Sequence, residues 1–202
     1  MAINPVRNIA PFINVTFTVT SAWWEERWVT IHRGLDIATG ANDTVYSMLT
    51  GKVLELGGSP STSTGYYIII YDDRQTVDGN PNPTYGYATR YLHLQYRPLY
   101  VVGQSVQVGE AIGKEGATGT GVTGIHLHVE MQDISRFNWQ WHASYTKSDY
   151  LDPTIFMGID NIEGTQWRYD GTPVPPTPPT PTGSSKSQFK WVLYANKFGR
   201  YR

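Results

Sequence analysis

Residues 124–130 are the part of this sequence that most constrains its fold, because they alternate strictly as Gly-Ile-His-Leu-His-Val-Glu. His126, His128 and Glu130 occupy every second position, and aliphatic residues fill the positions between them. A period of two is the signature of a β-strand with one buried face. We therefore expect a strand that is anchored in a core by its aliphatic side and projects both imidazoles from the other side.

The composition also favours a β-rich fold. Charged residues make up only 16% of the chain, while Tyr 14, Trp 7 and Gly 20 are high counts for 202 residues. Aromatic and β-branched side chains suit a pleated surface, and this length is enough for one domain with a real core. The net charge of -1 provides no whole-chain attraction to nucleic acid. The sequence has no cysteine, which excludes disulfides and thiolate metal sites.

Further strands are predicted from aliphatic or alternating runs. They lie at 12–20, 45–49, 51–56, 66–71 and 85–96, with two short strands within 101–116. Residues 21–31 form either a loop wall or a pair of strands. Asp152-Pro153 predicts the start of a helix, with Asp as the N-cap and Pro at the first helical position.

Two loops are predicted beside the histidine strand. The glycine-rich loop 116–124 leads into a strand and not a helix, so we reject a nucleotide-binding loop and expect it to keep one wall of a groove low. Residues 132–149 are polar and aromatic, and we expect them to affect substrate preference and not the metal. Within them, His142 has no partner at a suggestive spacing and is interpreted as a surface residue.

Two further motifs supply candidate ligands. His32 begins an H-x-x-x-D motif that ends at Asp36, and a spacing of four places both side chains on one face of an extended or a helical segment. Gly34 between them allows a bend. His93 lies in the strand predicted at 85–96, where alternation places it on the same face as Tyr91. Either motif alone is weak evidence, since a solvated turn or a half-buried histidine would explain it.

Together these motifs suggest a zinc site. Catalytic zinc sites use three nitrogen or oxygen ligands from the protein and keep a fourth position for water. His32, Asp36 and one member of the pair His126/His128 can supply the three ligands. The two remaining histidines would flank the open position, where hydrolysis needs groups that move a proton.

The ordered set His32-x-x-x-Asp36, Tyr91-x-His93-Leu94 and His126-x-His128 resembles the lysostaphin/LytM-type zinc endopeptidases of peptidoglycan. The resemblance covers residues 12–157 and includes the Gly-Glu-Ala-Ile-Gly turn at 109–113. It implies a mostly β fold of the duplicated hybrid motif type, with an antiparallel sheet, a central active-site groove and few short helices. It also implies a zinc-dependent endopeptidase that hydrolyses the peptide cross-bridges of the bacterial cell wall.

By this resemblance, His32, Asp36 and His128 bind Zn2+, while His93 and His126 are catalytic. The choice of His128 over His126 comes from the family, because alternation does not separate them. The absence of H-E-x-x-H excludes the helix-based metalloprotease mechanism. Glu130 is either a support for a metal ligand or a solvated carboxylate at the end of a strand, and we favour the solvated carboxylate.

The domain organisation is predicted from composition. Residues 1–171 would form the catalytic domain, residues 172–185 a Pro/Thr-rich linker, and residues 186–202 a basic, aromatic tail. We expect no signal peptide and no transmembrane segment. A second resemblance, to the wall-cutting domains of phage tail-tip or tail-knob proteins, implies delivery by a virion and contact of the tail with other virion proteins. The alternative function is a catalytically silent, metal-stabilised module that binds the cell wall.

Overall fold

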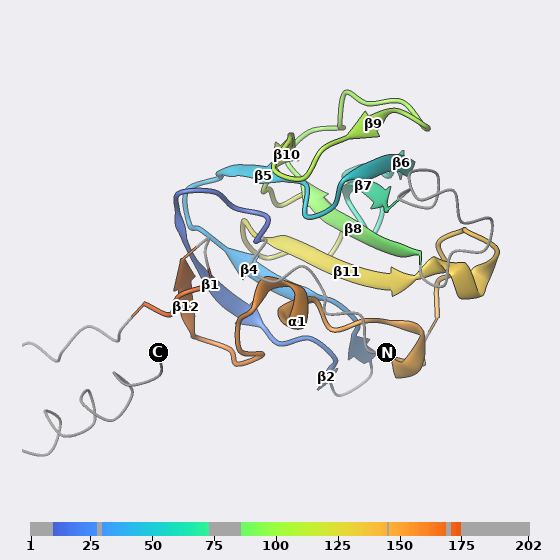
Figure 1. Ribbon diagram of the computed structural model, residues 1–202. Helices are drawn as coiled ribbons and strands as arrows, with labels where there is room; N and C mark the ends of the chain where they lie inside the picture. The colour runs from blue at the N-terminus through green and yellow to red at the C-terminus, as the bar shows by residue number, and fades with distance from the viewer. Residues whose placement is uncertain (1–9, 28–29, 73–85, 145, 169–170, 175–202) are drawn as a thin grey trace, which may run out of the picture.

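The computed structural model describes residues 10–27, 30–72, 86–144, 146–168 and 171–174 (Figure 1). Most of its elements are strands, so the expected mostly β class is confirmed. The strands are β1 Thr16–Ser21, β2 Glu25–Arg27, β3 Thr30–His32, β4 Leu35–Ala38, β5 Thr44–Tyr46, β6 Gly51–Gly57, β7 Tyr66–Tyr71, β8 Tyr87–Leu94, β9 Ser105–Val106, β10 Ala111–Lys114, β11 Leu127–Asp133 and β12 Gln166–Arg168. The helical elements are short: η2 Ile134–Phe137, η3 Lys147–Asp149 and α1 Pro153–Met157.

One antiparallel sheet dominates the described part of the chain. Its strand order is β12-β1-β4-β11-β8-β7-β6-β9, which places β11 between β4 and β8 in the middle of the sheet (Figure 1). Two smaller antiparallel pairs, β10-β5 and β2-β3, complete the strands. The strand with the two histidines is therefore a central strand, and its neighbours on both sides can present residues to it.

The register of the sheet separates a core face from a second face. Val129 on β11 pairs with Tyr91 on β8, and both lie in the main hydrophobic cluster. One residue further on β11, Glu130 pairs with Arg90, which pairs with Ile69 on β7. Ile69 belongs to a second, smaller cluster that is packed by Tyr67, Tyr71, Trp139 and Trp141. Because successive residues of a strand point to opposite faces, the site residues of β11 share the face of this smaller cluster.

Tyr91 anchors the core face through its ring and its hydroxyl. Its side chain is fully buried, and its oxygen accepts a hydrogen bond from the backbone N–H of Met48 at 2.7 Å. The variant Tyr91→Phe would leave this buried N–H unpaired, so we expect the free energy of unfolding to fall by about 1–3 kcal/mol. Urea denaturation measures the change, and an unchanged midpoint would contradict this account of the core.

Several strand predictions are confirmed and others need correction. The strand predicted at 45–49 is β5 and ends at Tyr46, and the histidine strand begins only at Leu127, after His126. Residues 66–71 form β7 as predicted, and residues 21–31 contain the strand pair β2-β3. The strand predicted at 12–20 begins only at Thr16, because Asn14 has a left-handed backbone (φ 61°) that interrupts the extended conformation. The helix predicted at Asp152-Pro153 is α1, and the carboxylate of Asp152 accepts the N–H of Thr154 at 2.9 Å.

The last described residues pair with β12. The N–H of Arg168 donates to the carbonyl of Thr172, and the N–H of Val174 donates to that of Gln166, each at 2.8 Å. The rest of the predicted linker and the whole predicted tail lie outside the described residues, so both domain boundaries stay predictions. None of the helices in the described part of the chain combines the length and the apolar character needed to cross a membrane.

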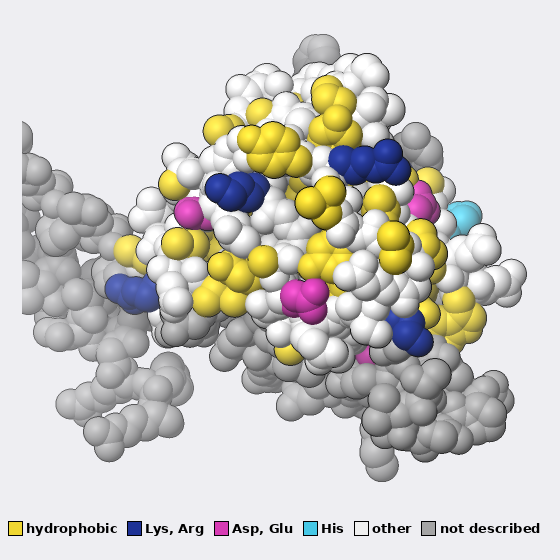
Figure 2. Space-filling view, turned by 90° about the horizontal axis from the view of Figure 1, so that it is seen from above, with side chains coloured by type: hydrophobic (Ala, Val, Ile, Leu, Met, Phe, Trp, Pro, Cys, Tyr) yellow, Lys and Arg dark blue, Asp and Glu magenta, His cyan; other side chains and the backbone are white. Residues whose placement is uncertain are grey.

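The connection between β8 and β9 carries half of the exposed large hydrophobic residues in the described part of the chain. These are Tyr96, Leu99, Val101 and Val102, with Val108 just beyond β9. Figure 2, seen from above, shows hydrophobic side chains mixed with Lys and Arg on this side of the molecule.

Candidate metal centre

Three strands bring the candidate ligands together through their register. Asp36 on β4 pairs with Ser21 on β1 and with His128 on β11. Directly paired residues of an antiparallel sheet point to the same face, with their Cβ atoms about 5 Å apart. Residues that are distant in sequence therefore become neighbours in one row across the sheet.

His32 reaches the same point by a turn. Four residues along an extended strand span ~13 Å, yet His32 Nε2 lies 3.1 Å from Asp36 Oδ1. Strand β3 ends at His32, β4 begins at Leu35, and Gly34 lies in the bend between them. The bend that Gly34 was expected to allow is present, and it brings the two side chains together.

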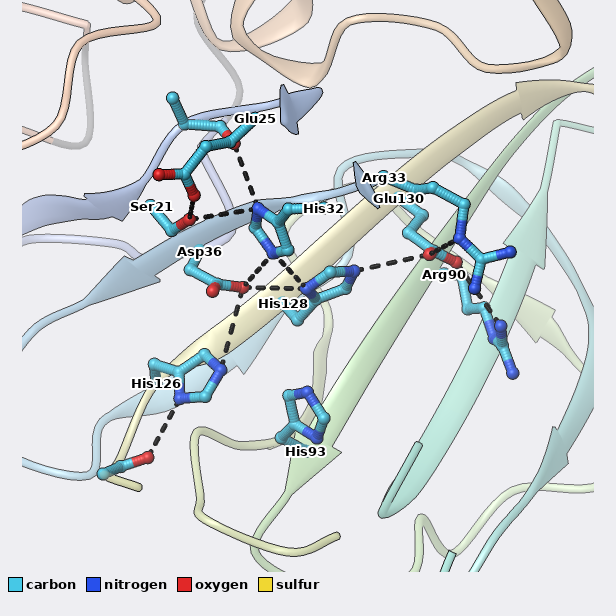
Figure 3. Close-up of polar contacts among 12 residues, drawn as sticks. Ser21, Glu25, His32, Arg33, Asp36, Arg90, His93, His126, His128 and Glu130 are labelled. Atoms are coloured by element: carbon cyan, nitrogen blue, oxygen red, sulfur yellow. Dashed lines mark hydrogen bonds and ion pairs between the residues drawn. The ribbon is translucent and has the colours of Figure 1, made fainter. Parts of the chain in front are cut away.

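The three donor atoms form a compact triangle (Figure 3). His128 Nδ1 is 2.8 Å from Asp36 Oδ1 and 3.0 Å from His32 Nε2. The ligands of a tetrahedral zinc ion with bonds of ~2.0 Å lie about 3.3 Å apart. Two imidazole nitrogens and one carboxylate oxygen at this spacing are a donor set that fits zinc.

His126 and His93 lie beside this triangle and not in it. His126 Nε2 is 3.7 Å from Asp36 Oδ1. The ring centroid of His93 is 4.9 Å from that of His126 and 5.7 Å from that of His128. All five histidine and aspartate positions predicted from the sequence therefore converge in one place.

A bulge in β8 directs His93 toward the site. Regular alternation would put His93 on the core face with Tyr91, and that prediction is wrong. His93 has a left-handed backbone (φ 62°), and the pairing of β8 with β7 shifts register between Tyr66 and Ile68. β-Bulges are over-represented beside active sites, where they redirect a side chain.

Backbone carbonyls fix the tautomers of these two histidines. His93 Nδ1 donates to the carbonyl of Thr118 at 2.9 Å, and His126 Nδ1 donates to that of Gly124 at 2.9 Å. A carbonyl only accepts, so both Nδ1 atoms carry a proton and both Nε2 atoms keep a lone pair in the neutral ring. Loop 116–124, expected only to keep a groove wall low, thus also orients His93, and no sequence signal indicated this.

The second ring nitrogen of each proposed ligand histidine, His32 and His128, also has a protein partner. His32 Nδ1 lies 3.0 Å from the carbonyl of Ala22 and 3.1 Å from Ser21 Oγ. His128 Nε2 lies 3.4 Å from Glu130 Oε1. Each ring therefore uses one nitrogen toward the triangle and the other toward a protein acceptor, the arrangement that orients metal-bound histidines.

The favoured interpretation of Glu130 is wrong, because its side chain is not solvated. Glu130 is 3% exposed and contacts His128, with Arg90 Nη1 at 3.4 Å and Arg33 Nε at 3.9 Å. The alternation of 126, 128 and 130 contained the signal that it shares a face with the ligands. Its burial depends on segments packed over that face, which alternation does not reveal.

Burial and neighbouring charges shift the pKa values in opposite directions. Burial and the charges of His128 and His126 lower the pKa of His93 to about 4. Burial acts to lower the pKa of His128, but the hydrogen bonds to Asp36 and Glu130 raise it to about 9. Burial acts to raise the pKa of the carboxyl groups of Asp36 and Glu130. The hydrogen bonds from His128 and His32 nevertheless hold that of Asp36 well below its usual range. The hydrogen bond from His128, together with the charges of His128, Arg90 and Arg33, lowers that of Glu130 to about 2.

This fold and this donor set are those expected of the lysostaphin/LytM family. The model of Peptidase family M23 matches residues 30–138, more than half of the chain. The chain belongs to this family, as the sequence motifs predicted.

Solved structures agree with this assignment. A zinc containing peptidase from Vibrio cholerae is 28% identical, with a TM-score of 0.52 over 75% of this chain and 39% of that one. The antimicrobial peptidase lysostaphin from Staphylococcus simulans is 24% identical, with a TM-score of 0.50 over 70% of this chain and 49% of that one. The catalytic domain of the prophage-encoded M23 protein EnpA from Enterococcus faecalis is 20% identical, with a TM-score of 0.50 over 72% of this chain and 95% of that one. The last two show the fold alone, and the chain spans less than half of the first two.

Proposed function

We propose that this protein is a zinc-dependent endopeptidase that hydrolyses the peptide cross-bridges of bacterial peptidoglycan. His32, Asp36 and His128 would hold the zinc, while His93 and His126 would be catalytic. The observation that carries the proposal is the triangle of three donor atoms, whose sides are 2.8–3.1 Å, with two further imidazoles beside it. Membership of Peptidase family M23 and the likeness to a zinc containing peptidase support it.

The metal and the two imidazoles beside it would have different roles in hydrolysis. Zinc, when bound, supplies a Lewis acid that polarises a carbonyl and lowers the pKa of a bound water from 15.7 to about 7. The imidazoles of His93 and His126 would then move protons and stabilise developing charge on the substrate. Because the Nδ1 atoms of both rings are engaged by carbonyls, Nε2 is the atom of each that exchanges a proton.

The two rings differ in their surroundings. His93 is buried, whereas His126 is half-buried. The carbonyl of Thr118 fixes the ring of His93, and burial favours its neutral form, in which Nε2 keeps a lone pair. His126 Nε2 lies toward Asp36, on the other side of the triangle from Glu130. We therefore propose that both rings transfer protons through Nε2, which accepts a proton when the ring is neutral and donates to a developing oxyanion only when the ring is protonated.

A cell-wall clearing assay tests the proposed activity. The purified protein should clear suspensions of bacterial cell wall, and His126→Ala should reduce the rate by a factor on the order of 100 or more. Mass spectrometry of the released fragments identifies the bond that is cut. Zinc and wall binding without cleavage, across several wall types, would favour the non-catalytic wall-binding module.

The proposed place of action is the bacterial cell wall, and the supports are the family and the likeness to lysostaphin, which is an antimicrobial peptidase. Association with a virion, and docking of the tail on other virion proteins, remain proposals from the sequence. The residues that would carry that docking lie outside the described part of the chain.

A further inference from the structure

Glu130 contacts His128, a proposed zinc ligand, at its outer nitrogen, which is the ring nitrogen that faces away from the donor triangle. His128 presents Nδ1 to the donor triangle and Nε2 to Glu130 Oε1, which is 3.4 Å away. The imidazole therefore lies between two carboxylates, Asp36 on one side and Glu130 on the other (Figure 3). A carboxylate on the outer nitrogen fixes the orientation and tautomer of a metal-bound histidine and makes it a stronger ligand.

Two arginines hold Glu130 in turn. Arg90 Nη1 lies 3.4 Å from Oε2, the oxygen that does not face His128. Arg33 Nε lies 3.9 Å from Oε1, and this residue directly follows His32 in the chain. Both carboxylate oxygens of Glu130 thus have a partner, as a buried charge requires. The carboxylate cannot rotate away from His128 without leaving one of the arginines.

The segment that follows β11 covers these arginines together with Tyr67 on β7. The carbonyl of Ser144 accepts a hydrogen bond from Arg33 Nη1 at 2.9 Å, and the Arg33 guanidinium lies 5.9 Å from the ring centroid of Tyr150. The Arg90 guanidinium lies 4.6 Å from the ring of Tyr67 and 5.7 Å from that of Trp141. Residues 134–144 and 146–150 therefore reach the metal centre through the arginines, a role that the sequence did not predict.

We propose that Glu130 is a positioning residue for His128 and that residues 134–144 and 146–150, acting through Arg33 and Arg90, cover the outer side of the metal centre. The inference rests on the proposed zinc site. It adds that the zinc affinity of that site depends on residues that contact neither the zinc nor the substrate.

Glu130→Gln is the primary test, with zinc affinity measured by competition with a chelator. Glutamine keeps the shape of the side chain and an oxygen for His128 Nε2, but it removes the negative charge that the arginines hold. We expect zinc to bind about 10- to 100-fold more weakly. We also expect the absorption bands of the cobalt-substituted protein to shift, because the orientation of His128 changes. Far-UV circular dichroism of the same samples confirms folding.

Glu115→Gln is the matched control. Glu115 is also a fully buried carboxylate, but it accepts from the backbone N–H groups of Thr39 and Asp43, each at 3.2 Å, and contacts no histidine. Its loss should lower stability and leave zinc affinity and the cobalt spectrum unchanged. Equal losses of zinc affinity in both variants would overturn the proposal, because the effect would then be a general consequence of destabilisation.

Trp141→Ala tests the covering segment separately, with His142→Ala as its neighbour control. We expect Trp141→Ala to bind zinc more weakly than the wild type. We expect His142→Ala to keep the wild-type zinc affinity, because the side chain of His142 is exposed and stacks on Phe137. Wild-type affinity in both Glu130→Gln and Trp141→Ala would overturn this inference alone. Failure of the wild-type protein to bind zinc would instead overturn the proposed function.

Discussion

Replacing His32 or Asp36 by alanine is expected to abolish tight zinc binding, whereas His93→Ala should keep the zinc and lose turnover. His32 Nε2 and Asp36 Oδ1 form one side of the donor triangle, so removing either leaves two ligands. His93 lies outside the triangle, with its ring centroid 5.7 Å from that of His128. Its loss should therefore leave the donor atoms in place. We expect hydrolysis to slow by about 10²- to 10⁴-fold.

Metal analysis by mass spectrometry and the rate of cleavage of a soluble bridge peptide measure the two effects independently. His142→Ala is the control, because this exposed histidine lies outside the site. It should keep both zinc and activity. The reverse pattern, with zinc lost in His93→Ala and kept in Asp36→Ala, would refute the assignment of ligands.

Gly34→Ala is expected to disturb the metal centre without removing any ligand. A Cβ at this position would lie 2.6 Å from Cε1 and 2.8 Å from Cδ2 of His128, well inside contact distance. The ring has little freedom to retreat, since Asp36 and Glu130 hold its two nitrogens. Overpacking of this kind typically lowers stability by about 1–3 kcal/mol. We expect zinc affinity to fall at least about tenfold as well, because the orientation of a ligand is lost.

Gly113→Ala on β10 is the control for this substitution. Its Cβ would approach only the Leu94 side chain, at 3.3 Å, and no histidine. Titration of each variant with zinc in the presence of a chelator gives the affinities, and thermal unfolding gives the stabilities. If Gly34→Ala bound zinc as tightly as Gly113→Ala, the close approach of β3, β4 and β11 described above would be wrong.

The strand character of the chain was predictable because it depends on local patterns. The fully apolar run at 66–71 is strand β7, and the aliphatic residues of 127–129 lie in the core beneath the site. The candidate ligands were also predictable, since imidazole and carboxylate groups in three short motifs already form a donor set for zinc.

The geometry of the site was less predictable, because it depends on contacts between distant residues. Asp36 and His128 are 92 positions apart in sequence, and the pairing of β4 with β11 brings them to 2.8 Å. This pairing, and not the alternation of residues 124–130, places His128 in the donor triangle and leaves His126 beside it. Likewise the bulge at His93 arises where β8 shifts its register against β7.

The sequence by itself determined that this chain forms a β-sheet carrying histidines and a carboxylate able to bind zinc. Only the tertiary structure decided which nitrogens face one another and that Glu130 is buried against His128 and two arginines. A period of two specifies which side of a strand a residue occupies. What covers that side depends on segments that pack over it from elsewhere in the chain.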